Sequence, residues 1–497
     1  MMSAAGSGRN TGLALVTRPL QNRYPRRRLL AAFLVAAVAA ACEPIEDVQE
    51  ALFLAEPDTP REAYMQALQV AGLKGTALAR DWAAAAERAL AAPAAVPTPY
   101  SEAGYLAPDQ PSALGLRFEA RRGWRIVVDL EVDADTASLF FVEAYRAARA
   151  DEDGPLLVAA ADSGARPFVF EAHRDGEYIV RLQPELLRGG RYTLELRAGP
   201  SLAFPVDAAD NQDVHSVFGD PRDGGARDHH GIDIFAPRGT PALAAAAGIV
   251  SRVQDTERGG KVVWMDAGDG SGDRRSRTRL YYAHLDSQLV QRGQRVRAGD
   301  TIGLIGNTGN ARTTPPHLHF GVYQRGPVNP YPFVARIDTV PARIVADPAA
   351  VLEAGAWART IAPASLISSP TGRARTLDLL PRHSAVRLAA ATARGYRVTL
   401  PDGRMGFIAA AQLEPAVEPL SGPRLGGPGL VRTAPGPRAA VIDSVAGPAP
   451  VLAESGGFLL VRGDGGRIGW LAASAAGTDA TAAAAQRAAA ASTNGGY

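Results

Sequence analysis

The chain has 497 residues, 46% of them hydrophobic and 21% charged, which is a globular composition on a chain too long for one compact core. The formal net charge of +2 depends on six arginines within residues 1–41, a segment that contains no acidic residue. In the rest of the chain acidic residues outnumber basic ones, so the composition gives no reason to expect nucleic-acid binding.

The N-terminal segment has the features of an export signal. Arg26, Arg27 and Arg28 precede LLAAFLVAAVAAA, an apolar run at residues 29–41. This run is too short to cross a bilayer whose hydrocarbon core is about 30 Å thick. We therefore expect residues 1–41 to be a signal peptide.

The single cysteine, Cys42, follows this run directly, and one thiol cannot form an internal disulfide. Its position resembles a bacterial lipobox, in which the cysteine is acylated and becomes the mature N-terminus. An ordinary signal followed by an incidental cysteine is the alternative. We expect an exported, periplasmic protein that is anchored to the membrane through lipid on Cys42. Glu43 favours the outer membrane, since lipoproteins retained in the inner membrane often carry Asp there.

Residues 42–110 are predicted to form a helical hairpin and a linker. The sequence TPRE at residues 59–62 is a capping box with proline at the first helical position. A second helix is expected from Thr76 to about Leu90. Three prolines between residues 93 and 99 then indicate the linker.

Residues 111–205 contain runs in which apolar and polar side chains alternate. The run WRIVVDLEV at residues 124–132 is the clearest, and EYIVRLQ and RYTLELR have the same period of two. Such runs are typical of half-buried strands, and glycines lie between them. We expect a β-sandwich here.

Residues 206–335 carry six of the eight histidines. Three segments stand out: HHGID (229–233), YYAHL (281–285) and HLH (317–319). Alternate residues of a strand point to the same side, so His317 and His319 would face one common site. The two prolines before His317 cannot donate to a ladder, so strand pairing should begin near His317.

His229 and Asp233 are a second pair, with Gly231 permitting a turn between them. These two residues and one histidine of HLH would supply two nitrogens and one oxygen, the open ligand set of a catalytic zinc. The same set could hold iron(II) in an oxygenase. The remaining histidine of HLH and His284 could then move protons, because imidazole titrates near neutral pH.

The order of HxxxD, LYYAHL and GNTGNARTTPPHLHFGVY resembles the LytM/lysostaphin family of zinc metalloendopeptidases, which cut peptide cross-links in peptidoglycan. The resemblance runs from VFGDPRDGGARDHHGIDIFAPRGTP through GPVNPYPF. It implies the duplicated hybrid motif fold, a mostly antiparallel sheet with long loops beside a narrow groove. It also implies one Zn²⁺ per domain, held by His229, Asp233 and His319. His317 would be the general base, and His284 would stabilise the oxyanion or move a proton.

Several polar residues near these motifs are expected to line the substrate groove: Asn307, Asn310, Arg312, Thr313 and Tyr282. A solvated loop would have the same composition at residues 307–313. Tyr281 and Tyr282 alternate along a strand, so only one of them can face the site. His215 and His230 are expected to be structural or to border the groove.

The C-terminal part contains a weak internal repeat, in which DGRMGFIAA (402–410) matches GGRIGWLAA (465–473). Each copy follows an apolar strand. Residues 360–415 and 428–474 therefore resemble two bacterial SH3-like domains, which often accompany cell-wall enzymes. Two purely structural β-modules are the alternative.

The predicted fold is mainly β and multidomain. It comprises an N-terminal helical hairpin, a β-sandwich, an antiparallel β-sheet core of the LytM-type peptidase and two small SH3-like barrels. Residues 336–359 would be a connector and residues 475–497 a disordered tail. We expect a monomer that hydrolyses peptide bonds in peptidoglycan stem peptides or cross-bridges, held on the wall by the SH3-like pair. The alternative is a non-catalytic, wall-binding activator of an amidase.

Overall fold

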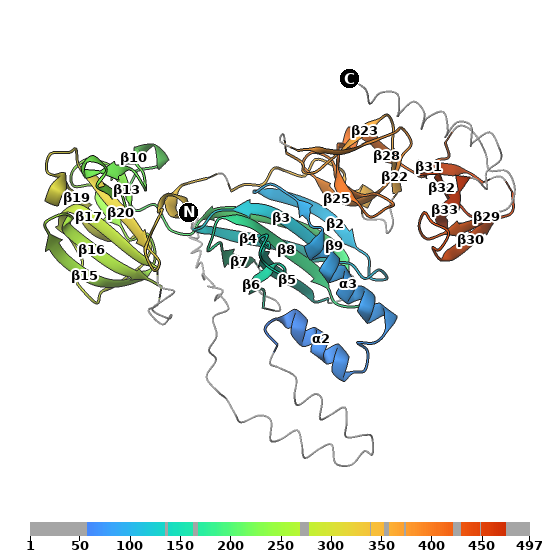
Figure 1. The fold of residues 1–497 in the computed structure, drawn as a ribbon, viewed down its shortest axis with the longest axis horizontal. Helices are drawn as coiled ribbons and strands as arrows, with labels where there is room; N and C mark the ends of the chain where they lie inside the picture. Colours follow the sequence, from blue (N-terminus) through green and yellow to red (C-terminus); the bar gives the residue numbers. More distant parts are fainter. Residues whose placement is uncertain are drawn as a thin grey trace, which may run out of the picture.

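The computed structural model describes residues 57–134, 138–162, 167–268, 278–337, 339–351, 357–371, 374–420, 429–447 and 449–473. The predicted signal peptide, Cys42 and the predicted tail lie outside these ranges. Three β-rich regions follow one another along the long axis, and the domain of residues 206–335 lies at one end (Figure 1). The prediction of a mainly β chain with a helical N-terminal part is confirmed. Among the described helices, none is long and apolar enough to span a bilayer.

Both N-terminal helices form where the sequence predicts them: α2 spans Pro60–Val70 and α3 spans Ala77–Ala91. The Thr59 side chain accepts a hydrogen bond from the backbone N–H of Glu62 and so caps α2. α3 packs against the sandwich. Its buried Trp82 donates from Nε1 to a carbonyl oxygen of β8 at 2.7 Å.

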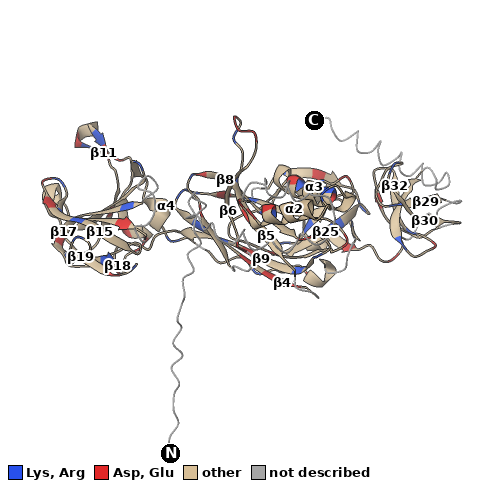
Figure 2. Cartoon of the chain, turned by 90° about the horizontal axis from the view of Figure 1, so that it is seen from below, with Lys and Arg blue, Asp and Glu red and all other residues tan. Residues whose placement is uncertain are grey.

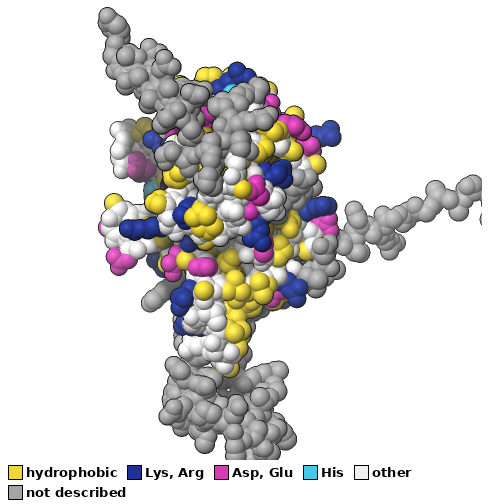
Figure 3. All heavy atoms as spheres, turned by 90° about the vertical axis from the view of Figure 1, so that its right-hand side faces the viewer, with side chains coloured by type: hydrophobic (Ala, Val, Ile, Leu, Met, Phe, Trp, Pro, Cys, Tyr) yellow, Lys and Arg dark blue, Asp and Glu magenta, His cyan; other side chains and the backbone are white. Residues whose placement is uncertain are grey.

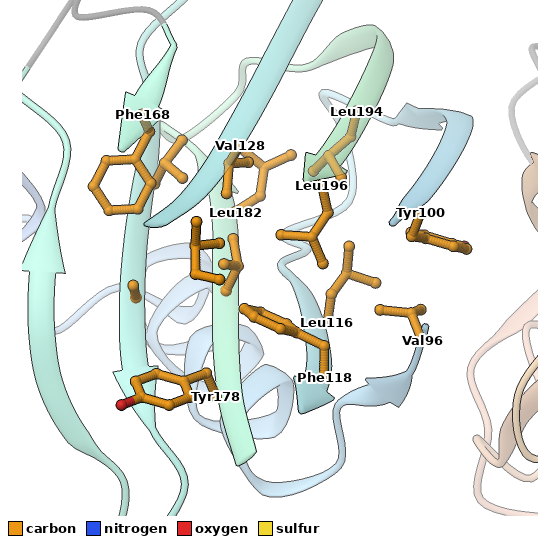
Figure 4. Close-up of a cluster of buried hydrophobic side chains, with 14 of the residues drawn as sticks. Val96, Tyr100, Leu116, Phe118, Val128, Phe168, Tyr178, Leu182, Leu194 and Leu196 are labelled. Carbon is orange, nitrogen blue, oxygen red and sulfur yellow. The ribbon is translucent and has the colours of Figure 1, made fainter. Parts of the chain in front are cut away.

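The sandwich consists of two facing sheets. One has the strand order β1-β3-β8-β5-β6, and the other contains β2-β9-β4-β7. The bounds are β1 Ala94–Ala95, β2 Tyr100–Leu106, β3 Leu114–Ala120, β4 Trp124–Asp133, β5 Phe140–Arg146, β6 Leu156–Ala160, β7 Phe168–Glu171, β8 Gly176–Pro184 and β9 Gly190–Pro200. The alternation in β4 turns Val128 toward Leu116 and Leu182 of the opposite sheet, in the core drawn in Figure 4.

The prediction of a linker up to residue 110 is wrong for residues 100–106, which form β2. β2 pairs with β9 along one edge and with β25 (Ala385–Thr392) along the other. Nearly all of its residues are buried, so both of its faces are covered. Its Glu102 is fully buried and forms two 2.9 Å hydrogen bonds with Arg397. A buried, paired charge removes the polar–apolar alternation, which is why the strand is not evident in the sequence.

The histidine-rich domain, residues 206–335, is built on one large sheet with the central order β10-β13-β20-β17-β16-β15-β18. β19 pairs with β14 and β17, β21 pairs with β20, and β11 and β12 form a separate ribbon. The strands are β10 Val214–Ser216, β11 Pro221–Arg222, β12 Arg227–Asp228, β13 Ile232–Phe235, β14 Pro241–Leu243, β15 Gly248–Thr256, β16 Gly260–Ala267, β17 Arg279–Gln288, β18 Arg295–Val296, β19 Thr301–Ile305, β20 His317–Tyr323 and β21 Pro327–Val328. The helices are η1 Asn211–Asp213, η2 Asp223–Gly225, η3 Gly309–Ala311 and α4 Tyr331–Val334.

Two small β-modules follow the histidine-rich domain. The first contains η4 Pro348–Val351, β22 Trp357–Thr360, β23 Ala364–Ile367, β24 Thr376–Leu380, β25, β26 Tyr396–Thr399, β27 Met405–Ile408, η5 Ala410–Gln412 and β28 Leu413–Pro415. The second contains β29 Gly429–Arg432, β30 Val441–Val445, β31 Val451–Ser455, β32 Phe458–Arg462 and β33 Ile468–Ala472. The repeat extends to strand register, because Leu366 pairs with Asp378 as Val431 pairs with Asp443. Membership of the SH3-like class stays a prediction.

The first module does not begin where the sequence suggests. β22 starts at Trp357 and Val351 belongs to the core of the first module, so the predicted connector 336–359 is partly module. The two modules also pack against each other. Trp357 and Trp470 form an edge-to-face pair at 5.3 Å, and Arg359 donates to the carbonyl oxygen of Leu452 at 2.7 Å.

Acidic and basic residues are interspersed along the described chain (Figure 2). The face at the end that carries the second module shows hydrophobic side chains among charges of both signs (Figure 3). Neighbouring strands often pair these charges, as Arg197 on β9 does with Asp129 on β4 at 3.3 Å.

Candidate metal centre

Two adjacent antiparallel strands, β13 and β20, bring the predicted polar residues together. Asp233 lies opposite His319, and Phe235 lies opposite His317. His317 and His319 therefore share a face of the sheet with Asp233, as the HLH pattern predicts. β20 begins at His317, immediately after the two prolines, which agrees with the predicted start of pairing.

Three side chains converge on one point. Nε2 of His229 lies 2.9 Å from Nδ1 of His319 and 3.1 Å from Oδ1 of Asp233, and Nδ1 of His319 lies 2.9 Å from the same Oδ1. His229 is 2% exposed and Asp233 is 7% exposed. Two imidazole nitrogens and one carboxylate oxygen at this spacing are a suitable donor set for zinc with an open fourth position.

Neighbouring groups orient these donors. Nδ1 of His229 lies 2.9 Å from the carbonyl oxygen of Val217, so it carries the ring proton and leaves the lone pair on Nε2. Arg222 donates from Nη2 to Oδ2 of Asp233 and to Oγ of Ser216, both at 2.6 Å. Asp233 therefore presents Oδ1 to the cluster while Oδ2 is held from the other side.

Burial and hydrogen bonding oppose each other in the pKa values of the cluster. Burial by itself would raise the pKa of Asp233, but its close contacts with His229 and His319 bring it well below its ordinary value. Burial lowers the pKa of His319 despite its contact with Asp233. An ionised carboxylate beside neutral imidazole is the state that binds a cation.

Two further histidines lie next to the cluster with their rings 5.0 Å apart. His317 points Nδ1 at the carbonyl oxygen of Pro315 at 2.9 Å and stacks on Phe235. His284 points Nδ1 at the carbonyl oxygen of Thr308 at 2.8 Å, and burial lowers its pKa to about 4. These contacts place a proton on Nδ1 of each ring, so Nε2 is the atom that can accept a further proton.

His284 also has a backbone conformation that residues other than glycine adopt rarely, with φ of 62°. Its N–H donates to the carbonyl oxygen of Gly259 at 2.8 Å, which ties the strand β17 to the turn between β15 and β16. Such outliers are often found at functional sites. Nothing in the sequence indicates this strained position.

Residue 231 has to be glycine because no side chain fits at this position. A Cβ there would lie 2.6 Å from Cε1 of His319 and 2.6 Å from the carbonyl oxygen of Phe320. The sequence suggested that Gly231 permits a turn, whereas its φ lies outside the left-handed region. The reason for glycine is the close approach of the His319 ring.

The assignment of Tyr282 to the groove is wrong. Tyr282 is fully buried, and its hydroxyl accepts a hydrogen bond from the backbone N–H of Ala245 at 2.8 Å. Tyr281 faces the site instead, with its ring edge-to-face with His319 at 5.7 Å. The register decides this, because Tyr281 lies opposite Gly321, two residues beyond His319 on β20.

The other predicted groove residues lie in the loop before β20. Asn307 maintains the loop, since its Nδ2 donates to two loop carbonyl oxygens and its Oδ1 accepts from Arg238. Asn310, Arg312 and Thr313 are exposed, and their role in substrate binding stays a prediction.

The histidines that were expected to be structural or at the border of the groove are both exposed. His215 on β10 stacks on Phe235 of the neighbouring strand β13 at 5.0 Å, and His230 stacks on Phe218 at 6.2 Å. Arg222 is the main residue that the sequence did not reveal, since it lies in a ribbon that only the fold brings to Asp233.

Comparison with known proteins places these motifs in a family model. Residues 227–330 match the model of peptidase family M23. The peptidoglycan DD-endopeptidase ShyC of Vibrio cholerae serotype O1 is 40% identical over 101 residues, which are 20% of this chain and 21% of that protein. The L-Ala--D-Glu endopeptidase of Bacillus subtilis is 34% identical over 131 residues, 24% of this chain and 38% of that protein.

The chain thus spans between about a fifth and two fifths of the length of these relatives. Among solved structures, the catalytic domain of lysostaphin from Staphylococcus simulans is 31% identical, with coverage of 24% of this chain and 87% of that chain and a TM-score of 0.21. The chain therefore carries, at residues 227–330, a domain that matches peptidase family M23 and that contains the whole His229, Asp233 and His319 cluster.

Proposed function

We propose that this protein is a zinc metalloendopeptidase that hydrolyses peptide bonds of peptidoglycan. The observation that carries the proposal is the convergence of His229, Asp233 and His319 on one point, with two unligated histidines beside it. The matched family and the two peptidoglycan endopeptidases support the substrate class. One of these relatives is a DD-endopeptidase and the other an L-Ala--D-Glu endopeptidase, so the proposal covers the peptide bonds of peptidoglycan as a class.

The zinc ion would be held by Nε2 of His229, Oδ1 of Asp233 and Nδ1 of His319. When bound, zinc lowers the pKa of a water molecule to about 7 and polarises a carbonyl group. His317 would take a proton from the attacking water on Nε2, since its Nδ1–H donates to the carbonyl oxygen of Pro315. His284 likewise directs Nδ1 at the carbonyl oxygen of Thr308, so its Nε2 is the atom that accepts a proton. This arrangement suits proton transfer better than stabilisation of an oxyanion by a hydrogen bond from Nε2.

The experiment that tests this proposal is digestion of purified peptidoglycan by the full chain, with new amino termini measured in the presence and absence of a chelator. We expect release that stops with the chelator and returns with zinc. Asp233→Ala and His319→Ala should lose zinc and activity together. His317→Ala should keep zinc and lose about 10²–10⁴-fold in turnover, as for other general bases.

A non-catalytic activator would give a different result. It would release no amino termini by itself and would stimulate only an added amidase. Iron in the purified protein together with oxygen uptake would instead favour the oxygenase. Full turnover by the His317→Ala protein would refute the role of His317.

We further propose that the chain is exported and attached to the outer membrane through lipid on Cys42, and that it acts as a monomer with the two C-terminal modules on the wall. The sequence of residues 26–43 supports the anchor. Mass spectrometry of the N-terminal peptide tests it, and a Cys42→Ser protein should leave the membrane fraction. A wild-type N-terminal peptide without acyl chains would refute it.

A further inference from the structure

Three aromatic side chains form a continuous surface beside the metal centre. Trp264 on β16 lies 4.4 Å from Tyr281 on β17 and 5.0 Å from Tyr323 on β20, measured between ring centroids. Tyr281 and Tyr323 are 6.4 Å apart. We call these three residues the aromatic shelf.

The shelf and the metal centre lie on the same face of the sheet. Tyr281 is opposite both Trp264 and Gly321 in the strand register. His319, Gly321 and Tyr323 are alternate residues of β20, so their side-chain positions share that face. Tyr281 contacts the ring of His319 at 5.7 Å, which makes the shelf continuous with the proposed site of cleavage.

The core of the domain does not require these rings. The residues of the opposite face, such as Leu280, Phe320 and Val322, are fully buried, whereas each shelf residue keeps part of its surface in solvent. The outward face of such a sheet usually carries polar side chains. Three adjacent aromatic rings on it indicate a binding surface rather than a packing requirement.

Gly321 allows the shelf rings to pack close to the backbone of the sheet. A Cβ at this position would lie 2.9 Å from the ring of Tyr323 and 3.4 Å from Cβ of Tyr281. The missing side chain therefore leaves room for the Tyr323 ring to pack close to the backbone of β20. Two exposed arginines lie at the edge of the shelf that is far from His319. Arg279 places its guanidinium 5.6 Å over the Trp264 ring, and Arg252 lies opposite Trp264 in the strand register.

We propose that the aromatic shelf binds an N-acetylated amino sugar of the glycan strand whose peptide enters the metal centre; this rests on the proposed function. Peptidoglycan stem peptides consist of alanine and of residues with charged side chains, which offer no flat apolar face. The pyranose ring does have such a face, formed by its C–H groups, and it can lie on an aromatic ring. The edge arginines suit the carboxylates of the attached stem peptide.

The kinetic test compares two substrates on the zinc-loaded full chain: a cross-linked dimer that carries its disaccharide, and the same peptide dimer without sugar. Trp264→Ala should raise KM for the sugar-bearing dimer about tenfold, which corresponds to the loss of one ring contact. The kcat for this dimer and both kinetic constants for the sugar-free substrate should be unchanged. Trp264→Phe should restore most of the difference. Gln254→Ala, an exposed change on β15 outside the shelf, is the matched control and should behave as wild type.

A binding test separates this inference from the proposed function. Calorimetric titration with tetra-N-acetylchitotetraose, done on the full chain in a chelator, requires no catalysis. Binding by the wild type that is lost in Trp264→Ala supports the shelf, even if the chain cuts no peptidoglycan. Equal losses on both peptide substrates, or cleavage by the wild type without any sugar binding, would overturn the shelf and leave the peptidase standing.

Discussion

The exclusion of a side chain at residue 231 leads to a strict test of the metal centre. In a Gly231→Ala protein the new Cβ would lie 2.6 Å from Cε1 and 2.7 Å from Nε2 of His319. Ordinary van der Waals contact begins at 3.4 Å, so the ring must withdraw by about 0.8 Å. The carbonyl oxygen of Phe320, on the same strand β20, would also lie 2.6 Å from the new Cβ. β20 therefore cannot move toward residue 231 to restore the position of the His319 ring.

A shift of this size is large for a metal ligand. Zinc–nitrogen bonds are about 2.0–2.1 Å long, and deviations beyond about 0.2 Å already depart from a normal site. Misplacement of a reacting group by about 1 Å can cost about 100-fold. We therefore expect Gly231→Ala to weaken zinc binding and to lower activity by one to two orders of magnitude. The overpacking should also cost about 1–3 kcal/mol in stability.

Zinc affinity can be measured by competition with a chromogenic chelator, with circular dichroism to verify the fold. Gly326→Ala is the matched control, since its Cβ would have nothing within 4 Å and its φ is not left-handed. If Gly231→Ala bound zinc as tightly as Gly326→Ala, the argument that the His319 ring is held in place by close packing would be wrong.

Three further outcomes are expected. Arg222→Gln should release Oδ2 of Asp233 and lower peptidoglycan cleavage by about 10–100-fold, and unchanged kinetics would rule out a positioning role. Burial alone would raise the pKa of Glu102, but Arg397 holds this pKa below its ordinary value. The pair therefore stabilises the fold fully above about pH 4.5, and this stabilisation is lost as the pH falls through the pKa of Glu102 in the folded protein. Arg397→Met should therefore cost about 3–5 kcal/mol at pH 7 and less at pH 4, where Glu102 can protonate; calorimetry that shows the same loss at both pH values would contradict this. Tyr282→Phe should leave activity intact and lower the free energy of unfolding by about 1–3 kcal/mol, measured by thermal unfolding, because the buried N–H of Ala245 loses its partner. Reduced turnover at full stability would instead support a role for Tyr282 in the substrate groove.

Local patterns were informative wherever one face of an element is solvated. Alternation in residues 124–132 predicted β4, and the cap at Thr59 predicted the start of α2. The same reasoning failed for β2, since a strand covered on both faces has no alternation and its buried Glu102 resembles a surface residue. Burial by a distant partner such as Arg397 cannot be inferred from the local sequence.

The sequence by itself determined the side-chain chemistry of this protein. The HLH period places two imidazoles on one face because strand side chains alternate, and the HxxxD segment contains the other two donor residues. The tertiary structure decided what surrounds these donors. The register of β17 against β20 selects Tyr281 over Tyr282, and the β11–β12 ribbon brings Arg222 to Asp233. These contacts join segments far apart in the chain, and their geometry depends on how whole strands pair, which no local pattern specifies.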